Sequence, residues 1–197
     1  MTGRYRCVLG KAGFMTAGAA LLLAAGVANA SSRPLYEGRN DEFRGKSLEQ
    51  QVQLLVDREE IRDLIAIYAH RAANRQSMAD LFTDDGAFIN RPTGNTAPQV
   101  VRGRPELDAF FNSLGTQPQQ PLPMLHNFLI SVEGDEARAL SSIEVRILHD
   151  GHIMDGSGYY RDRFRRVDGR WKFVERDCTF LAMIPQANPA AKPSAPR

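Results

Sequence analysis

The stretch GYYRDRFRRVDGRWKF, residues 158–173, decides the fold that we expect for this chain. Asp168-Gly169 is a two-residue turn of the kind that joins neighbouring antiparallel strands. It predicts a long strand over residues 153–167 and a last strand over about 170–181, because side chains alternate on both sides of the turn. The folded part of the chain is therefore expected to end in an antiparallel hairpin.

Two further strands are expected before this hairpin. Residues 125–133 and 137–149 alternate in character, and Asp150-Gly151 is a turn signal after the second run. Gly156 and Gly158 would permit a bulge or a bend in the strand that follows. The face of the second run that we expect to point inward carries Ile143, Val145, Ile147 and His149.

A long helix is expected at the start of the folded part. Ser47 is a plausible N-cap, and Gln50 can complete a capping box with it. No glycine or proline interrupts the chain from there to about Ala73. Apolar residues recur at helical spacing, namely Leu54, Leu55, Ile61, Leu64, Ile65 and Tyr68. Ala72 lies one turn after Tyr68 on the same side.

Shorter elements connect this helix to the strands. We expect a short helix over residues 78–82, a strand over 87–90, a loop over 91–98 and a helix over 104–114 with Pro105 in its first turn. Helices that precede an antiparallel meander favour an α+β domain in which the helices pack on one face of a curved sheet.

The N-terminus has the pattern of an export signal. Arg4, Arg6 and Lys11 precede an apolar run over residues 17–28, and Ala28-Asn29-Ala30 is a small-x-small cleavage pattern. The run is short for a bilayer span, so we expect export to the periplasm or medium, cleavage after Ala30 and no stable membrane insertion afterwards. An uncleaved N-terminal anchor is the alternative.

Removal of residues 1–30 would change the charge and the cysteine content. Three of the 25 basic residues would be lost, which leaves 22 against 23 acidic ones, a formal charge of −1. A nucleic-acid partner would need a basic patch or stripe, and none is expected. Cys178 would be the one remaining cysteine, so an internal disulfide is excluded.

These observations predict four segments. Residues 1–30 form the signal, 31–46 a linker, 47–185 one domain, and 186–197 an Ala/Pro-rich tail that we expect to be disordered.

Several motifs together resemble the SnoaL-like proteins of the nuclear transport factor 2-like superfamily. They are Asp57 through Tyr68, Leu81 through Asp85, Gly103, His126, Gly134-Asp135, and Gly158 through Phe173. The resemblance covers about residues 50–180. It implies a cone-shaped α+β barrel, in which a curved antiparallel sheet wraps around an apolar pocket that the N-terminal helices close. It also implies a homo-oligomer, a dimer or a trimer.

The chain is most similar to the branch that holds scytalone dehydratase and hexachlorocyclohexane dehydrochlorinase. These enzymes remove a proton and expel a leaving group without metal or cofactor. His126 matches the histidine of that branch, and His149 matches a second histidine of the dehydratase. The aspartate that pairs with the first histidine is missing, because Ala73 or Asn74 stands at its position; another register would offer Asp80.

The resulting hypothesis is a lyase or isomerase that needs no cofactor and acts on a small apolar molecule. His126 would be the acid or base, and His149 and Tyr68 would polarise an oxygen or orient a water. Each of these residues has a structural alternative. His126 could be a core or ligand-contacting histidine, His149 a surface histidine, and Tyr68 a core aromatic residue. Expected ligand contacts are Ala72, Phe128, Val145, Ile147, Tyr160 and Phe164. No metal-ligand set is convincing. A non-catalytic binding protein and a scaffold domain stay open as alternatives.

Overall fold

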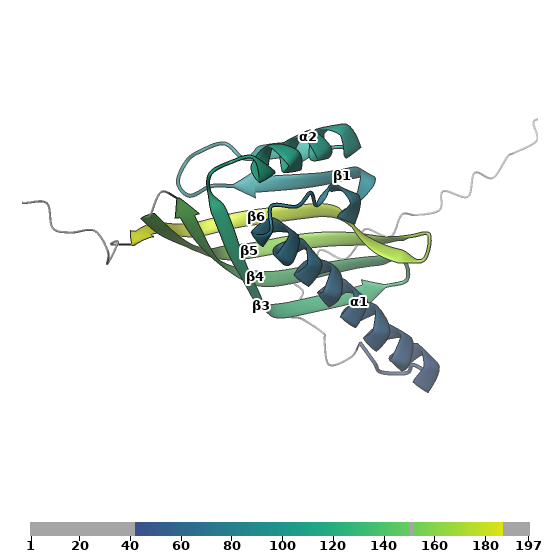
Figure 1. Cartoon of the computed structure of the whole chain (residues 1–197). Helices are drawn as coiled ribbons and strands as arrows, with labels where there is room; N and C mark the ends of the chain where they lie inside the picture. Colours follow the sequence, from purple (N-terminus) through teal and green to yellow (C-terminus); the bar gives the residue numbers. More distant parts are fainter. Residues whose placement is uncertain (1–41, 150–151, 187–197) are drawn as a thin grey trace, which may run out of the picture. The chain divides into compact units, whose positions relative to one another are not determined.

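The computed structural model describes residues 42–149 and 152–186, without the side chain of His149 (Figure 1). The export signal, most of the linker and all of the tail after Gln186 lie outside these residues, so those expectations stay predictions. The elements in chain order are α1 (Leu48–Ala73), the 3-10 helix η2 (Ala79–Leu81), β1 (Phe82–Arg91), β2 (Gln99–Arg102), α2 (Arg104–Gly115), β3 (Gln120–Glu133), β4 (Glu136–His149), β5 (His152–Val167) and β6 (Arg170–Gln186).

The six strands form one curved sheet in the order β2-β1-β6-β5-β4-β3. The strands from β3 to β6 are consecutive antiparallel neighbours, whereas β1 runs parallel to β6. Figure 1 shows α1 crossing one face of the sheet and α2 lying near β1. The α+β prediction is confirmed. The sheet is mixed, because β1 runs parallel to β6, and it is not a closed barrel, because β2 and β3 form its two edges.

The first helix begins as expected. The Ser47 hydroxyl accepts a hydrogen bond from the Gln50 backbone N–H, and the Gln50 side chain accepts one from the Ser47 N–H. Both halves of the capping box are therefore present. Five of the six predicted apolar residues are buried, but Leu55 is 55% exposed because it points away from the sheet.

The strands extend beyond their expected bounds. The strand β2 lies in a segment for which no strand was predicted, and β1 begins at Phe82 rather than at Ala87. The reason for β2 is tertiary: residues 99–102 pair with residues 87–90 of β1, a contact that no local pattern reveals. The predicted helix over residues 78–82 is a single 3-10 turn.

The glycines of β5 permit the expected bend. The β5–β6 register shifts between Ser157 and Gly158. A Cβ on Gly156 would lie 2.5 Å from Met183 Sδ and 2.9 Å from Val145 Cγ1, so only glycine fits there without displacing a neighbour.

Aromatic rings fill the core between α1, α2 and the sheet. The Phe82 ring lies 5.2 Å from that of Phe173 and 5.7 Å from that of Phe111, and Tyr68 makes edge contacts with all three. These side chains are buried. The core therefore fixes the ring of Tyr68 against the inner face of the sheet.

One arginine ties the helix to the hairpin turns. Arg166 Nη2 lies 2.6 Å from Asp57 Oδ1 on α1, and Arg166 Nε lies 3.1 Å from Asp135 Oδ1 in the β3–β4 turn. Its guanidinium also lies 4.4 Å from the ring centroid of Trp171. Asp57 is buried beneath this contact, although a charged side chain on a helix usually faces the solvent. Among the described residues, no helix has the length and apolar character needed to cross a membrane.

Candidate functional site

The role predicted for His126, an acid or base in an apolar pocket, requires an inward side chain, and the side chain points outward. Asn127 adopts a left-handed backbone with φ of 55°, and the β3–β4 register shifts between His126 and Leu129. A bulge of this kind adds one residue and exchanges the faces of the strand before it. Ile130 therefore points into the core, whereas His126 lies on the outer face with its Nε2 3.7 Å from Glu144 Oε1.

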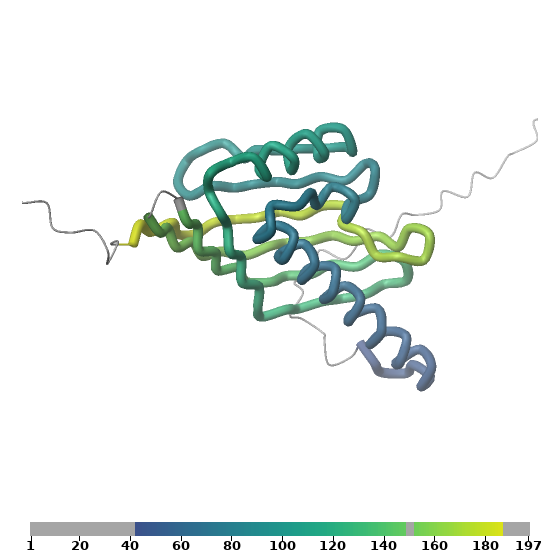
Figure 2. Tube along the Cα trace, viewed as in Figure 1, coloured from purple at the N-terminus to yellow at the C-terminus, as the bar shows by residue number. Residues whose placement is uncertain are grey.

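This orientation weakens the assignment of His126 as the acid or base. Its side chain is 44% exposed. Alternation back from Phe128 and Ile130 would place His126 on the inner face, but these two residues lie on the far side of the bulge. Figure 2 shows β3 descending from α2 and then turning sharply, and β3 pairs with β4 on both sides of the register shift.

The second histidine cannot be placed as a side chain. The backbone of His149 ends β4 and pairs with His152. Its side chain lies outside the described residues, so the polarising role predicted for it stays a prediction.

A cluster of polar side chains lies instead on the inner face of the sheet beneath α1. Ser141 on β4 is opposite Tyr160 on β5, Asp162 on β5 is opposite Arg176 on β6, and Tyr160 is also opposite Cys178. All five side chains are buried. The helix α1 contributes Tyr68, whose ring centroid lies 6.3 Å from that of Tyr160.

The centre of this cluster is an ion pair that solvent does not reach. Arg176 Nη1 donates a 3.1 Å hydrogen bond to Asp162 Oδ2, and both side chains have an exposed fraction of 0%. The guanidinium carbon lies 3.7 Å from the ring centroid of Tyr160, 4.1 Å from that of Tyr68 and 4.8 Å from that of Phe173. The pair is thus enclosed by aromatic faces, which attract a cation when water is absent.

Burial controls the acidity of these groups. Loss of hydration raises the pKa of Asp162 to about 7, although the positive charge of Arg176 opposes the rise. Loss of hydration also raises the pKa of Cys178 to about 12 and raises the pKa values of Tyr68 and Tyr160 well above the ordinary range. Asp162 is therefore the group of this cluster that exchanges a proton near neutral pH.

Several polar atoms of the cluster have no hydrogen-bond partner. They are Asp162 Oδ1, Arg176 Nε, Arg176 Nη2 and Ser141 Oγ. Buried polar atoms in native proteins are nearly always paired with protein, with ordered water or with a ligand. The cluster therefore has the hydrogen-bonding capacity to hold a polar group that comes from outside the chain.

The remaining residues predicted to contact a ligand are distributed around this cluster. Tyr160 belongs to it, and Phe164 packs on Phe173 with ring centroids 4.9 Å apart. Val145 is buried. The residues Ala72, Phe128 and Ile147 are partly buried and pack against the core.

Asp80 on η2 does not supply the carboxylate that would pair with His126. Asp80 forms an ion pair with Arg71 at 2.5 Å and is exposed, and His126 lies on the other face of the sheet.

The sequence analysis did not predict Asp162 and Arg176 as site residues. A signal for Asp162 existed, because it lies midway between Tyr160 and Phe164, which share the inner face by alternation. The same alternation relates Arg176 to Cys178.

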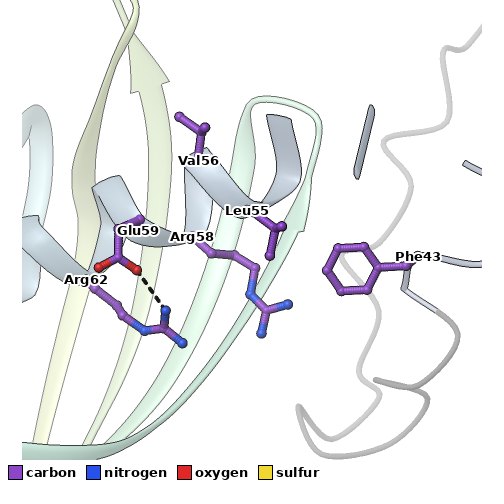
Figure 3. Close-up of a pocket in the computed structure, with 6 residues that line it drawn as sticks. All are labelled: Phe43, Leu55, Val56, Arg58, Glu59 and Arg62. Carbon is purple, nitrogen blue, oxygen red and sulfur yellow. Dashed lines mark hydrogen bonds and ion pairs between the residues drawn. The ribbon is translucent and has the colours of Figure 1, made fainter. Parts of the chain in front are cut away.

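The structure also has a pocket on the opposite side of α1, near its N-terminal end. Its volume is about 470 Å³, and Figure 3 shows the ring of Phe43 facing Leu55 and Arg58. Arg58 lies 5.8 Å from the Phe43 ring centroid and pairs with Glu42 at 3.3 Å. This pocket contains none of the predicted site residues. No group of three or more potential metal ligands occurs among the described residues.

The comparisons agree with this architecture. No curated protein matches the chain. A variant of Rv3472, a protein of unknown function from Mycobacterium tuberculosis, is 28% identical over 67% of this chain and 73% of its own, with a TM-score of 0.56. A candidate scytalone dehydratase from Novosphingobium aromaticivorans is 22% identical over 73% of this chain and 96% of its own, with a TM-score of 0.58.

A hexachlorocyclohexane dehydrochlorinase (LinA) Type2 is 18% identical over 74% of this chain and 99% of its own, with a TM-score of 0.60. The candidate scytalone dehydratase and the dehydrochlorinase are both less than 25% identical to this chain, so their similarity establishes the fold alone. The profile of the SnoaL-like domain matches residues 53–177. The chain therefore belongs to the SnoaL-like family of the nuclear transport factor 2-like superfamily.

Proposed function

We propose that the protein is a lyase or isomerase that needs no cofactor and moves a proton within a small hydrophobic molecule. The observation that carries the proposal is the buried Asp162–Arg176 pair, which has unpartnered atoms and lies between Tyr68 and Tyr160. A carboxyl group with a pKa of about 7 can accept or donate a proton at neutral pH. The relatives named as dehydrochlorinase and candidate scytalone dehydratase favour elimination as the reaction class.

In the proposed reaction, Asp162 replaces His126 as the acid–base group. The ionised Asp162 takes a proton from a carbon next to a carbonyl group, and the electron pair of that C–H bond moves onto the carbonyl oxygen. The free N–H groups of Arg176 donate hydrogen bonds to this oxyanion. The oxyanion then collapses in one of two ways. It expels the leaving group from the β-carbon, chloride as the anion or hydroxyl as water after Asp162 returns its proton to the leaving oxygen, or it regains the proton from Asp162 at another carbon.

The ligand must gain access to a closed site. The rings of Tyr68 and Tyr160 lie directly against the guanidinium of Arg176. Binding therefore requires the inner face of α1 to separate locally from the sheet, and we expect slow association.

Turnover of neutral β-substituted ketones tests the proposal. A panel with hydroxyl or chloride leaving groups would be followed by ultraviolet absorbance of the conjugated product. Asp162→Asn is expected to lower kcat/KM by about 100-fold or more, which is the usual contribution of a positioned acid or base. The value of kcat/KM is expected to rise with pH to a plateau above about pH 7, because the base is the ionised carboxylate.

His126→Ala is the matched control, since His126 lies on the outer face of the sheet. It is expected to leave turnover unchanged. Loss of turnover in His126→Ala, or full activity in Asp162→Asn, would contradict the assignment of Asp162.

A binding protein without chemistry is the second candidate. The observation that favours it is the absence of an aspartate at the end of α1, where Ala73 and Asn74 stand. It predicts that a ketone raises the melting temperature in proportion to the logarithm of its concentration, with no product formed.

Export and self-association complete the proposal. The pattern at residues 4–30 supports export with cleavage after Ala30, and the resemblance to SnoaL-like proteins is the reason to expect a homo-oligomer. Mass spectrometry of the protein from a periplasmic or medium fraction would test the first point, with a mature N-terminus at Ser31 expected. Analytical ultracentrifugation would test the second, and a monomer at micromolar concentration would contradict it.

A further inference from the structure

We propose that the Arg176–Asp162 site also binds small hydrophobic carboxylates, and that each binds together with one proton that Asp162 holds. The inference rests on the proposed location of the site but not on turnover. Carboxylates would then compete with neutral carbonyl substrates, and they would do so more strongly as the pH falls.

The geometry of Arg176 is the first argument. Asp162 accepts a hydrogen bond from Nη1 of the guanidinium, whereas Nε and Nη2 have no hydrogen-bond partner. The N–H groups on Nε and Nη2 point along the same edge of the planar guanidinium, at the spacing of the two oxygens of a carboxylate. A carbonyl oxygen places one atom at this edge, but a carboxylate places one oxygen on each N–H. The free edge is therefore complementary to a carboxylate.

The charge of the site is the second argument. An ionised Asp162 already neutralises Arg176, so a bound carboxylate would leave one negative charge uncompensated in a site that water does not reach. Protonation of Asp162 removes that charge. It also converts Asp162 from an acceptor into a donor that can hydrogen-bond to the ligand.

The neighbours of the pair do not supply the proton. Tyr68 faces Arg176 from α1, Tyr160 from β5 and Cys178 from β6, and burial raises the pKa values of all three far above neutrality. The charge of Asp177 acts on Asp162 as a secondary influence. Phe173 and Ser141 complete the surroundings and do not titrate. Asp162 is therefore the group that takes up the proton between pH 6 and pH 8.

The aromatic enclosure defines the rest of the ligand. The ring faces of Tyr68, Tyr160 and Phe173 lie within 5 Å of the guanidinium carbon. A flat or compact apolar body attached to the carboxylate would contact these rings once they move apart. Benzoate has this form, and acetophenone is its neutral match of nearly the same shape.

Titration calorimetry with benzoate and with acetophenone tests the inference. Benzoate is expected to bind about tenfold more weakly at pH 8 than at pH 6, because the protonated fraction of Asp162 falls about tenfold across its pKa of about 7. In two buffers of different ionisation enthalpy at pH 8, about one proton is expected to be taken up with each benzoate. Acetophenone is expected to bind with no proton uptake and no dependence on pH.

Two variants test which group takes up the proton and whether the planar edge of Arg176 binds the carboxylate. Asp162→Asn is expected to bind benzoate with no proton uptake and no pH dependence. Arg176→Lys keeps the charge without the planar edge, and it is expected to lose at least tenfold in benzoate affinity, about the effect of one lost charged hydrogen bond. Circular dichroism checks that both variants are folded. In the unaltered protein, benzoate is expected to shift the nuclear magnetic resonance signal of the Arg176 Nε–H group.

Three results would overturn the inference. They are benzoate binding without proton uptake, uptake that persists in Asp162→Asn, and absence of benzoate binding at pH 6. None of them bears on the ketone turnover assay, so the inference and the proposed function fail separately. Turnover without benzoate binding would mean that the edge of Arg176 accepts neutral oxygens alone.

Discussion

The buried carboxyl group of Asp162 should make the stability of the protein fall as the pH rises. Burial raises its pKa from 3.8 in an exposed chain to about 7 in the folded protein. The folded state therefore holds the proton more tightly than the unfolded state. The stability that this proton contributes is fully present below about pH 4, and it is lost as the pH rises through 7.

The size of the effect follows from the shift. Each pKa unit corresponds to about 1.4 kcal/mol, and roughly two units of the shift lie between pH 5 and pH 8. The contribution of Asp162 should therefore decrease by about 3 kcal/mol across this interval. Asp162→Asn cannot ionise, so its free energy of unfolding should lack this decrease. The difference between the unaltered protein and the variant isolates Asp162, because all other titrating groups are common to both.

Urea unfolding at pH 5 and pH 8 measures the difference. The stability of Asp162→Asn relative to the unaltered protein should rise by about 3 kcal/mol between the two pH values. Asp155→Asn is a suitable control, since Asp155 is partly exposed and pairs with Arg146 at 3.0 Å. Exposed ion pairs contribute about 1 kcal/mol or less. If Asp162→Asn and the unaltered protein lost stability in parallel, the carboxyl group would not be enclosed as described.

Three other substitutions examine the architecture by thermal or urea unfolding. His126→Ala should change the free energy of unfolding by less than about 0.5 kcal/mol, because the side chain is 44% exposed and outside the core; a large loss would place the imidazole inside. Gly156→Ala should cost about 1–3 kcal/mol, since its Cβ would lie 2.5 Å from Met183 Sδ, and the cost should shrink in a Met183→Ala background. Arg166→Met should cost about 2–3 kcal/mol by leaving the buried Asp57 without its 2.6 Å partner, and an Asp57→Asn background that recovered nothing would refute the pairing.

The sequence predicted correctly those features of the fold that depend on residues close together in the chain. The Ser47–Gln50 capping box, the Asp168-Gly169 turn and the bend at Gly158 depend on neighbouring residues, and all three occur where they were expected. The strand β2 depends on a partner in β1, so its own residues carried no signal.

The candidate site was harder to predict because it depends on which face each strand residue occupies. Alternation continues through β5, and it would have placed Asp162 beside Tyr160 and Phe164 on the inner face. Charged residues are seldom fully buried unless they are paired, so alternation alone does not indicate a buried aspartate. In β3, the left-handed backbone of Asn127 breaks the alternation that the run over residues 125–133 suggests.

The bulge at Asn127 decides which side chains of the first half of β3 face the interior. Since β3 has one residue more than β4 at this point, deletion of Asn127 would restore regular pairing and leave His126 outward and Leu125 inward. Regular pairing at the present chain length would instead slide the first half of the strand by one residue, so that the imidazole of His126 would turn inward and the side chain of Leu125 outward. A lineage with this fold could thereby gain an imidazole in its interior through the backbone conformation of one residue, and the histidine itself would stay unchanged in a sequence comparison.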